Sequence, residues 1–452
     1  MKKNILFINP WIFDFAAYDF WSKPLGLLYL ISYLGKCGFN VRYIDCLNIY
    51  NPYMKNSRLK KPKRKKYGTG KFWKQRVTTP SVLDWTKRPY YRYGITPEIL
   101  KEELMSSPRP DAILITSCMT YWYLGVVEVI KIAKKIYPET PIMLGGIYAK
   151  LCEEHAKENC DADIITLTSN PEDLLNYLKE LGLYPKKKLK FDPSLIYPAF
   201  SLYNKLDYIC IMTSKGCPYK CVYCASPYLN DDFCVRDPDD VFEEICYWNK
   251  ELEIIDFAFY DDALLVSANK HLGPLLEMVI KKGMKLHFHT PNAVHIKEID
   301  YEIAKLMYKA GFKTIRLGLE TIDMKLHQKL DRKVDLEHTY QAINYLFKAG
   351  FKSQQIGAYI LVGLPNQEID SIIKTIEFTK KMKIMPYLAE YSPIPHTSLW
   401  QEAIKSSCFE IEAEPLFHNN ILLPCWDKGR KKYMPILKKM VLEIREEIKK
   451  TF

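Results

Sequence analysis

Three cysteines stand close together near the middle of this chain. Cys217, Cys221 and Cys224 form a CxxxCxxC triplet just after the apolar run 208–212. Three thiolates on one loop can ligate three irons of a [4Fe–4S] cube, which leaves the fourth iron open to chelate a substrate or cofactor. A structural cluster or a zinc site would use a fourth protein ligand, and the next cysteine, Cys234, lies ten residues further on. The spacing therefore predicts a reactive cluster, with a zinc knuckle or scattered core thiols as the alternative.

An aromatic residue, Tyr223, immediately precedes the third cysteine. With it, the triplet resembles the signature of the radical S-adenosylmethionine (SAM) enzymes. In that family the open iron binds the amino and carboxylate groups of SAM, and an electron from the cluster cleaves SAM to a 5′-deoxyadenosyl radical. The resemblance implies Cys217, Cys221 and Cys224 as metal ligands. It also implies an electron donor such as a flavodoxin or ferredoxin, while the substrate stays unknown.

Length and composition bound the remaining possibilities. A chain of 452 residues predicts two domains, and 48% hydrophobic residues suffice for two cores. The thirteen cysteines are scattered, several in apolar runs, which favours reduced thiols and a cytoplasmic location. The apolar run 5–8 ends at Asn9 without a cleavage site, so we expect a first strand rather than a signal peptide. No stretch is apolar enough to predict a membrane span.

The formal charge of +12 is concentrated in one segment. Residues 55–76 hold eleven Lys or Arg and no acidic residue. Such a block can bind nucleic acid or anionic lipid, but a solvated loop is the simpler interpretation and is favoured. The aromatic residues Phe72 and Trp73 indicate that its second half packs on something.

Residues 1–185 alternate apolar strands with amphipathic helices, which predicts an α/β, doubly wound (Rossmann-like) domain with a basic insertion at 50–95. Expected strands cover 5–8, 41–44, 112–116 and 142–144; expected helices cover 24–34, 96–104 and 126–136. Residues 186–200, rich in Pro and Lys, are expected to be a linker.

This first half resembles the cobalamin-binding domain that precedes the radical domain in one subgroup of radical SAM enzymes. The matching stretches are Asn9-Pro10, Pro24–Gly26, Ile44-Asp45, Thr116-Ser117, Thr120–Trp122 and Leu144–Gly146. The resemblance implies cobalamin contacts from Pro24, Ser117, Gly145 and Gly146. Many such domains supply a histidine to cobalt, but no histidine precedes His155 here. A tight strand-to-helix turn is the alternative explanation for the two glycines, and a vestigial or differently used domain is the alternative to cobalamin binding.

Residues 201–405 resume the alternation, and six strand–helix units suit the partial (β/α)6 TIM barrel of radical SAM enzymes. Strands are expected at 208–213, 255–260, 286–290, 314–319, 355–361 and 387–391. Residues 406–452 are expected to be a C-terminal extension ending in an amphipathic helix over 433–450.

Polar residues follow the expected strands at their carboxyl ends, where sites of such folds lie. The resemblance implies that SAM is bound there by Tyr223, Asp261, Asp262, His289, Asn292, Arg316, Glu320, Ile360, Gly363 and Ser392. Two alternatives stay open. Arg316 and Glu320 could instead form a salt bridge, and His289 could pack outward under a helix.

These resemblances imply a radical SAM enzyme that uses cobalamin to methylate an unactivated carbon. Radical cyclisation or rearrangement without methyl transfer is the alternative reaction. An RNA-modifying enzyme that uses the basic segment 55–76 is a third hypothesis, in which nucleic acid would be the partner.

Overall fold

The computed structural model describes residues 2–106, 108–230, 232–330 and 335–451. The chain divides after Asp207 into two compact units, called here the first and second unit. Both are α/β units built on parallel sheets, as the alternation of strands and helices in the sequence predicts. Within the described part of the chain, no helix is long and apolar enough to cross a membrane.

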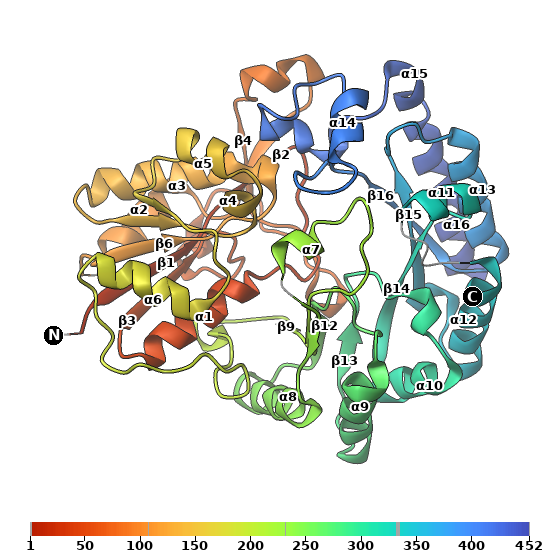
Figure 1. Cartoon of the computed structure of the whole chain (residues 1–452), viewed down its shortest axis with the longest axis horizontal. Helices are drawn as coiled ribbons and strands as arrows, with labels where there is room; N and C mark the ends of the chain where they lie inside the picture. The colour runs from red at the N-terminus through yellow and green to blue at the C-terminus, as the bar shows by residue number, and fades with distance from the viewer. Residues whose placement is uncertain (1, 107, 231, 331–334, 452) are drawn as a thin grey trace. The chain divides into compact units, whose positions relative to one another are not determined.

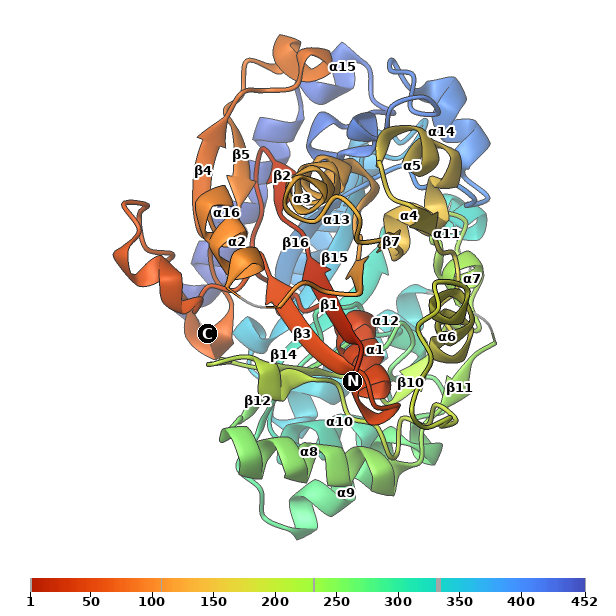
Figure 2. The same cartoon turned by 90° about the vertical axis from the view of Figure 1, so that its left-hand side faces the viewer.

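The first unit is built on a five-stranded parallel sheet in the order β3-β1-β6-β7-β8. Strands β3 and β1 run side by side in Figure 2 and pair from Asn4↔Asn40 to Asn9↔Asp45. The strands are β1 (Asn4–Asn9), β3 (Asn40–Asp45), β6 (Ala112–Ile115), β7 (Ile142–Leu144) and β8 (Ile164–Ile165). The helices are α1 (Leu25–Lys36), α2 (Pro97–Met105), α3 (Tyr123–Ile136), α4 (Ile147–Leu151), α5 (Glu153–Asn159) and α6 (Pro171–Glu180).

The insertion at 50–95 contributes two strands to a small antiparallel sheet that the sequence did not predict, and the third strand comes from residues 12–14. The order of this sheet is β2 (Ile12–Asp14), β5 (Tyr90–Tyr93), β4 (Lys74–Val77). Phe72 and Trp73 are buried, and the Trp73 ring nitrogen donates to the Ile49 carbonyl at 3.0 Å. The second half of the basic segment is therefore packed, as its aromatic residues predicted.

The segment expected as a linker is bonded to the first unit. The backbone of Lys186 donates to Cys37 at 2.9 Å, and that of Ala199 donates to Leu28 at 3.0 Å. Both acceptors belong to α1 or its carboxyl end. These residues are thus part of the packing around α1 rather than a free tether.

The second unit holds a six-stranded parallel sheet in which the strands follow one another in chain order. Figure 1 shows α9, α10, α12 and α13 on the outer side of these strands. The strands are β9 (Ile209–Ile211), β12 (Asp256–Phe259), β13 (His287–His289), β14 (Phe312–Glu320), β15 (Ile356–Val362) and β16 (Met385–Glu390). The longer helices are α8 (Pro238–Leu252), α9 (Leu272–Lys281), α10 (Tyr301–Ala310), α12 (Leu336–Ala349), α13 (Ile369–Lys381) and α16 (Met434–Thr451).

Local sequence signals set the helix ends of the second unit. The Asp300 side chain caps α10 by accepting from the Ile303 amide, and α10 ends at Gly311 with φ 104°. A glycine is favoured there because other residues rarely adopt positive φ. Helix α12 repeats the arrangement with Asp335 and Gly350. These helix ends precede β14 and β15 and so limit where these two strands begin.

The C-terminal extension belongs to the core of the second unit. Helix α16 packs on β15 and β16 through a cluster that includes Trp426 and Leu437, both fully buried. The Trp426 ring nitrogen donates to the Leu364 carbonyl at 3.1 Å. His418 is buried as well. Trp426 and His418 are therefore core side chains of this unit.

Candidate functional site

The cysteine triplet lies on one loop between two short elements, β10 (Ser214–Lys215) and α7 (Ser226–Leu229). Gly216 has φ 75°, which bends the chain just before Cys217. Cys221 is buried, whereas Cys217 and Cys224 are half-buried. The backbone of Val222 bonds to Leu330 at 3.0 Å and to Leu399 at 2.8 Å. Two distant segments thus hold the loop in place.

An aromatic residue inside the triplet adds a further anchor. The Tyr219 hydroxyl donates to Glu298 at 2.7 Å, and its ring lies 4.6 Å from that of His295. Burial, together with this hydrogen bond, raises the pKa of Tyr219 above its ordinary value, so the hydroxyl stays a donor. The sequence reading missed this anchor, because Glu298 lies far from Tyr219 along the chain.

The thiols fit a [4Fe–4S] cluster in number and chemistry. Among the described residues, no three His, Cys, Asp or Glu side chains converge on one metal position. A single-ion site would need such convergence, but in a cube each thiolate ligates its own iron. Cys217, Cys221 and Cys224 are the residues that would hold it. Cys234 is exposed and pairs with Lys215 across the β10–β11 ribbon, where β11 is Cys234–Val235.

The adjacent carboxylates after β12 have different surroundings. Asp261 is buried and accepts from the Thr213 hydroxyl at 2.7 Å, the Thr213 amide at 2.9 Å and the Ser214 hydroxyl at 2.6 Å. Burial raises the pKa of Asp261, and these hydrogen bonds oppose the rise. Asp261 therefore ties β12 to the end of β9, which is a structural role that the sequence reading did not predict.

Asp262 faces the cysteine loop. Its Oδ2 accepts from the Ser226 hydroxyl at 2.5 Å and from the Asn230 amide at 3.3 Å. The Ser226 backbone amide in turn lies 3.4 Å from the Cys224 sulfur. The carboxylate and the third thiol of the triplet are thus linked through one residue, which brings these two predicted site residues together.

His289, the last residue of β13, and Asn292, three residues beyond it, also differ in their surroundings. His289 is fully buried, with Nε2 3.0 Å from the Asp256 carboxylate and Nδ1 3.0 Å from the Thr314 hydroxyl. Burial lowers the pKa of His289, and Asp256 opposes this. Both ring nitrogens are engaged inside the protein, so the expected contact of His289 with SAM is not supported. Asn292 is exposed and donates to the Tyr260 carbonyl at 3.1 Å, beside the end of β12.

The two charged residues of β14 do not form the alternative salt bridge. Arg316 is buried, donates to the Ile315 carbonyl at 3.0 Å and stacks over the Tyr387 ring at 4.4 Å. Its Nε has no hydrogen-bond partner among the described residues. Glu320 ends the strand with φ 58°, a region that non-glycine residues rarely adopt, next to a shift of the β14–β15 register.

The segment after β15 is shaped by its own hydrogen bonds. Gly363 has φ 95°, and a Cβ there would lie 3.0 Å from Leu423. Gln367 donates to the Leu361 carbonyl at 2.8 Å and so closes the turn. The Ile360 side chain packs in the cluster with α13 and α16, so only its backbone could reach a ligand. The Ser392 hydroxyl donates to the His418 carbonyl at 2.6 Å.

Strand alternation explains why the Ile360 side chain packs against α13 and α16. Tyr359 and Leu361 point to the opposite face, and Leu361 packs with Val222 and Tyr223 of the cysteine loop. The predicted residue Tyr223 is therefore part of the contact between the loop and β15. The period of two in the sequence could have identified Leu361 instead of Ile360.

The strand ends of the first unit form a second candidate site. The Ser117 hydroxyl donates to Gly145 at 2.7 Å and accepts from the Ala149 amide at 3.2 Å. Gly146 has φ 96°, and a Cβ there would lie 2.3 Å from the Ser117 carbonyl. The turn itself thus requires glycine, as the alternative explanation held. Pro24 is the N-cap of α1 and lies on a separate loop.

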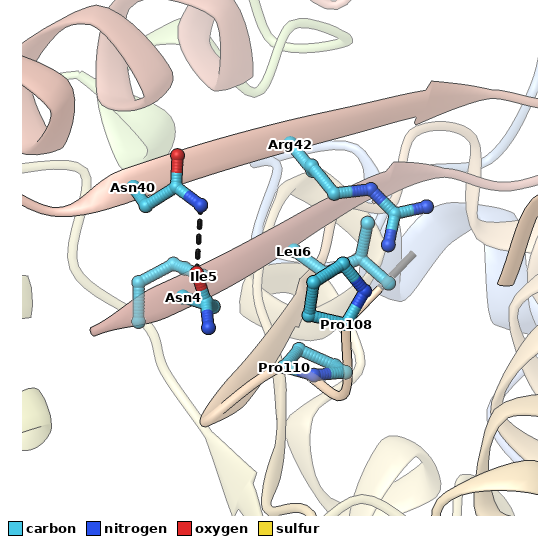
Figure 3. Close-up of a pocket in the computed structure, with 7 residues that line it drawn as sticks. All are labelled: Asn4, Ile5, Leu6, Asn40, Arg42, Pro108 and Pro110. Carbon is cyan, nitrogen blue, oxygen red and sulfur yellow. Dashed lines mark hydrogen bonds between the residues drawn. The ribbon is translucent and has the colours of Figure 1, made fainter. Parts of the chain in front are cut away.

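Exposed apolar residues flank this turn. Met119 is 44% exposed after β6, and Ile147 is 40% exposed after β7. At the opposite edge of the same sheet, where strands β1 and β3 begin, a small cavity of about 20 Å³ lies beside Asn4 and Arg42. Figure 3 shows the residues that line it. The apolar surface therefore lies at the carboxyl edge, where ligands of parallel sheets bind.

Comparison with known proteins identifies the second unit. Residues 211–379 match the sequence profile of the Radical SAM superfamily. The uncharacterized methyltransferase PH0819 of Pyrococcus horikoshii is 23% identical over 66% of this chain and 70% of its own length. The anaerobic magnesium-protoporphyrin IX monomethyl ester cyclase of Cereibacter sphaeroides is 25% identical over 68% of this chain, and the match covers 55% of the cyclase.

A solved structure matches almost the whole chain. The radical S-adenosylmethionine methyltransferase TsrM from Kitasatospora setae, with cobalamin and a [4Fe–4S] cluster bound, superimposes with a TM-score of 0.64. The match covers 91% of this chain and 76% of TsrM at 13% identity. At this identity the likeness establishes the fold. The domain that carries Cys217, Cys221 and Cys224 belongs to the radical SAM superfamily.

Proposed function

We propose that this protein is a radical SAM methyltransferase that uses cobalamin to methylate an unactivated carbon. The observation that carries the proposal is the match of both units to TsrM, whose structure holds a [4Fe–4S] cluster and cobalamin. A [4Fe–4S] cluster with SAM supplies a 5′-deoxyadenosyl radical, and methylcobalamin supplies a methyl group. The methyltransferase PH0819 supports the same reaction class.

The finer architecture is part of this proposal. The six parallel strands of the second unit follow one another in chain order, which is the order of a partial (β/α)6 barrel. The strand order of the first unit reads 2-1-3-4-5 when its parallel strands are renumbered, which is a doubly wound order. The proposed domains cover residues 1–185 and 201–405, with 186–200 as the segment between them and 406–452 as the C-terminal extension.

SAM would bind at the carboxyl ends of the second unit's strands. Asp262 would accept from the SAM ammonium group, because it faces the cysteine loop while Asp261 is used inside the protein. Glu320 would accept from the ribose hydroxyls. Backbone at Ile360 and Gly363 would face the adenine ring, and Ser392 is proposed beside them. Asn292, Tyr223 and Arg316 are proposed as further contacts.

Cobalamin would bind at the carboxyl ends of β6 and β7. Exposed Met119 and Ile147 offer apolar surface there, and Gly146 exposes backbone between them. Cobalt would receive no histidine from the first strand loop. His155 is engaged with the Tyr148 hydroxyl at 2.7 Å and packs against the Tyr123 ring. The described residues of the first unit would therefore supply no imidazole to cobalt.

The main alternative is radical cyclisation without methyl transfer, because a cyclase is among the similar proteins. The RNA hypothesis gains less support. Arg64 of the basic segment is used internally, where it pairs with Asp19 at 2.7 Å and Asp207 at 3.3 Å. A cytoplasmic location and an electron donor such as a flavodoxin or ferredoxin remain part of the proposal.

The test is anaerobic reconstitution with iron, sulfide, hydroxocobalamin, a chemical reductant and SAM labelled with deuterium in its methyl group, so that the reduced cobalamin can take its methyl group only from labelled SAM. The products formed from a cell extract are then analysed by mass. We expect 5′-deoxyadenosine together with a product that carries the labelled methyl. A product without label would indicate the cyclase alternative. Absence of 5′-deoxyadenosine from a protein that carries its full iron complement would overturn the proposal.

A further inference from the structure

A polar cavity of about 210 Å³ lies in the first unit, at the carboxyl end of β3. Its wall includes Tyr43, Asp45, Asn48, Tyr53, Glu103 and Tyr203. A single water needs about 10–15 Å³ measured in this way, so the space can accept a ligand of several non-hydrogen atoms. None of the residues proposed for SAM or cobalamin lines it.

One side of the cavity is a rigid set of hydrogen-bonding oxygens. Asp45, the last residue of β3, accepts from the Asn9 amide at 2.7 Å, the Leu47 backbone at 2.9 Å and the Tyr203 hydroxyl at 2.7 Å. The Tyr43 hydroxyl lies 2.9 Å from that of Tyr203. Burial raises the pKa of both tyrosines, so these hydroxyls remain protonated. The carboxylate is thus fixed in position before any ligand arrives.

The opposite side offers groups that the protein leaves unused. Glu103 Oε1 accepts from the Asn51 amide, and its Oε2 has no partner among the described residues. Asn48 accepts the Tyr50 backbone amide through Oδ1, while its Nδ2 also has no partner in the described part of the chain. An acceptor and a donor therefore face the space together, which is what a hydroxyl group needs, because it both donates and accepts.

The charges of the wall favour one class of ligand. Two carboxylates are among the described residues that line the cavity, and no Lys or Arg is. The nearest cations lie behind the wall, with Lys23 over the Tyr203 ring at 4.7 Å and Arg42 close enough to act on the Glu103 carboxylate. The lining therefore favours an uncharged polar ligand over a nucleotide or another phosphate ester. Exposed Tyr53 and Leu202, at 44% and 43%, provide an apolar rim on which a flat ring could pack.

The position of Asp45 in the sheet indicates which class of uncharged ligand the cavity binds. In the doubly wound domains that bind dinucleotides, a carboxylate at the end of the second parallel strand accepts from the ribose 2′-hydroxyl. Asp45 occupies this place, since β3 follows β1 and α1 and pairs with β1. We propose that the cavity between Asp45 and Glu103 binds the ribose of an uncharged nucleoside, with the base against Tyr53 and Leu202. This site is independent of the proposed methyl transfer.

Isothermal titration calorimetry of the whole chain tests the proposal with uridine, which avoids the adenosine moiety that SAM itself carries. We expect uridine to bind and 2′-deoxyuridine to bind at least tenfold more weakly. Glu103→Gln should weaken uridine by about tenfold, the loss of one hydrogen bond to a charged group. Glu102→Gln, on the exposed side of the same helix, is the matched control and should bind as the unmodified chain does.

Other outcomes would overturn the site. Binding of spermidine without uridine would show a cation site. Loss of hydroxocobalamin binding in Glu103→Gln would show that the cavity belongs to the cobalamin surface. If Glu103→Gln alters thermal unfolding, Asn48→Leu replaces it, because the added bulk should fill the cavity and abolish uridine binding. Uridine binding unchanged in a folded Asn48→Leu would refute the proposal.

Discussion

Replacement of Asp261 by Ala should mainly lower the stability of the fold, whereas replacement of the adjacent Asp262 by Ala should mainly lower the affinity for SAM. Asp261→Ala removes the acceptor of three buried donors of Thr213 and Ser214, of which the Thr213 hydroxyl keeps a second partner in His271 Nδ1 at 2.9 Å. Each unsatisfied donor costs about 1–3 kcal/mol, and partial relaxation should hold the total near 3–5 kcal/mol. Asp262→Ala removes an acceptor from a more open position, so stability should change by less than about 1 kcal/mol.

Affinity for SAM should change in the opposite order. Loss of a hydrogen bond from the SAM ammonium to Asp262 costs about 1–3 kcal/mol, which raises the Kd by about 5- to 150-fold. Urea denaturation of both variants measures stability from the midpoint at unchanged slope, and equilibrium dialysis of SAM measures affinity. A stable Asp261→Ala that loses SAM, beside a destabilised Asp262→Ala that keeps it, would refute these roles.

Further predictions concern three other places in the chain. Met119→Glu should weaken hydroxocobalamin binding at least tenfold without loss of stability. Met105→Glu, a control at the end of α2 that is more exposed (64% against 44%), should not weaken it, and equal binding by both variants would contradict an apolar cobalamin surface at Met119. Stability should fall as pH drops below about 6.5, because burial lowers the pKa of His289 and the unfolded chain therefore binds the proton more readily than the folded chain. Urea denaturation at a series of pH values measures this, and His289→Gln should make the stability depend less on pH in that range. An unchanged dependence of stability on pH in His289→Gln would contradict the prediction. Arg64→Gln should lower the melting temperature of the chain because it breaks two ion pairs, and the control Lys61→Gln, at an exposed residue, should leave it unchanged. A melting temperature in calorimetry that falls for Lys61→Gln but not for Arg64→Gln would show that Arg64 is not structural.

The strands and long helices could be predicted because their patterns are local. The cap at Thr96, the glycine ends of α10 and α12 and the apolar strand runs each depend on neighbours in sequence. The antiparallel sheet of β2, β5 and β4 could not be predicted in this way. It pairs Ile12 with Tyr93 across a long insertion, and β4 is mostly polar and exposed.

The same distinction applies to the site residues: those defined by local spacing could be predicted, and those defined by packing between distant strands could not. The cysteine triplet was visible because its meaning lies in its spacing. Asp261 and Asp262 look alike in sequence, and only the packing of β9 against β12 shows that one of them is buried among donors. His289 was likewise assigned to SAM from its place at a strand end, but its ring lies between Asp256 and Thr314 of the two neighbouring strands.

The most direct test of the central claim is the yield of 5′-deoxyadenosine from SAM under reducing, anaerobic conditions. It is measured together with bound iron for the unmodified chain, for Cys234→Ser and for the triple variant Cys217→Ala, Cys221→Ala, Cys224→Ala. We predict equal iron and product for the first two and neither for the triple variant, because three thiolates hold the cluster and Cys234 is exposed outside it. A triple variant that keeps its iron and cleaves SAM, or a Cys234→Ser variant that loses its iron, would contradict the account.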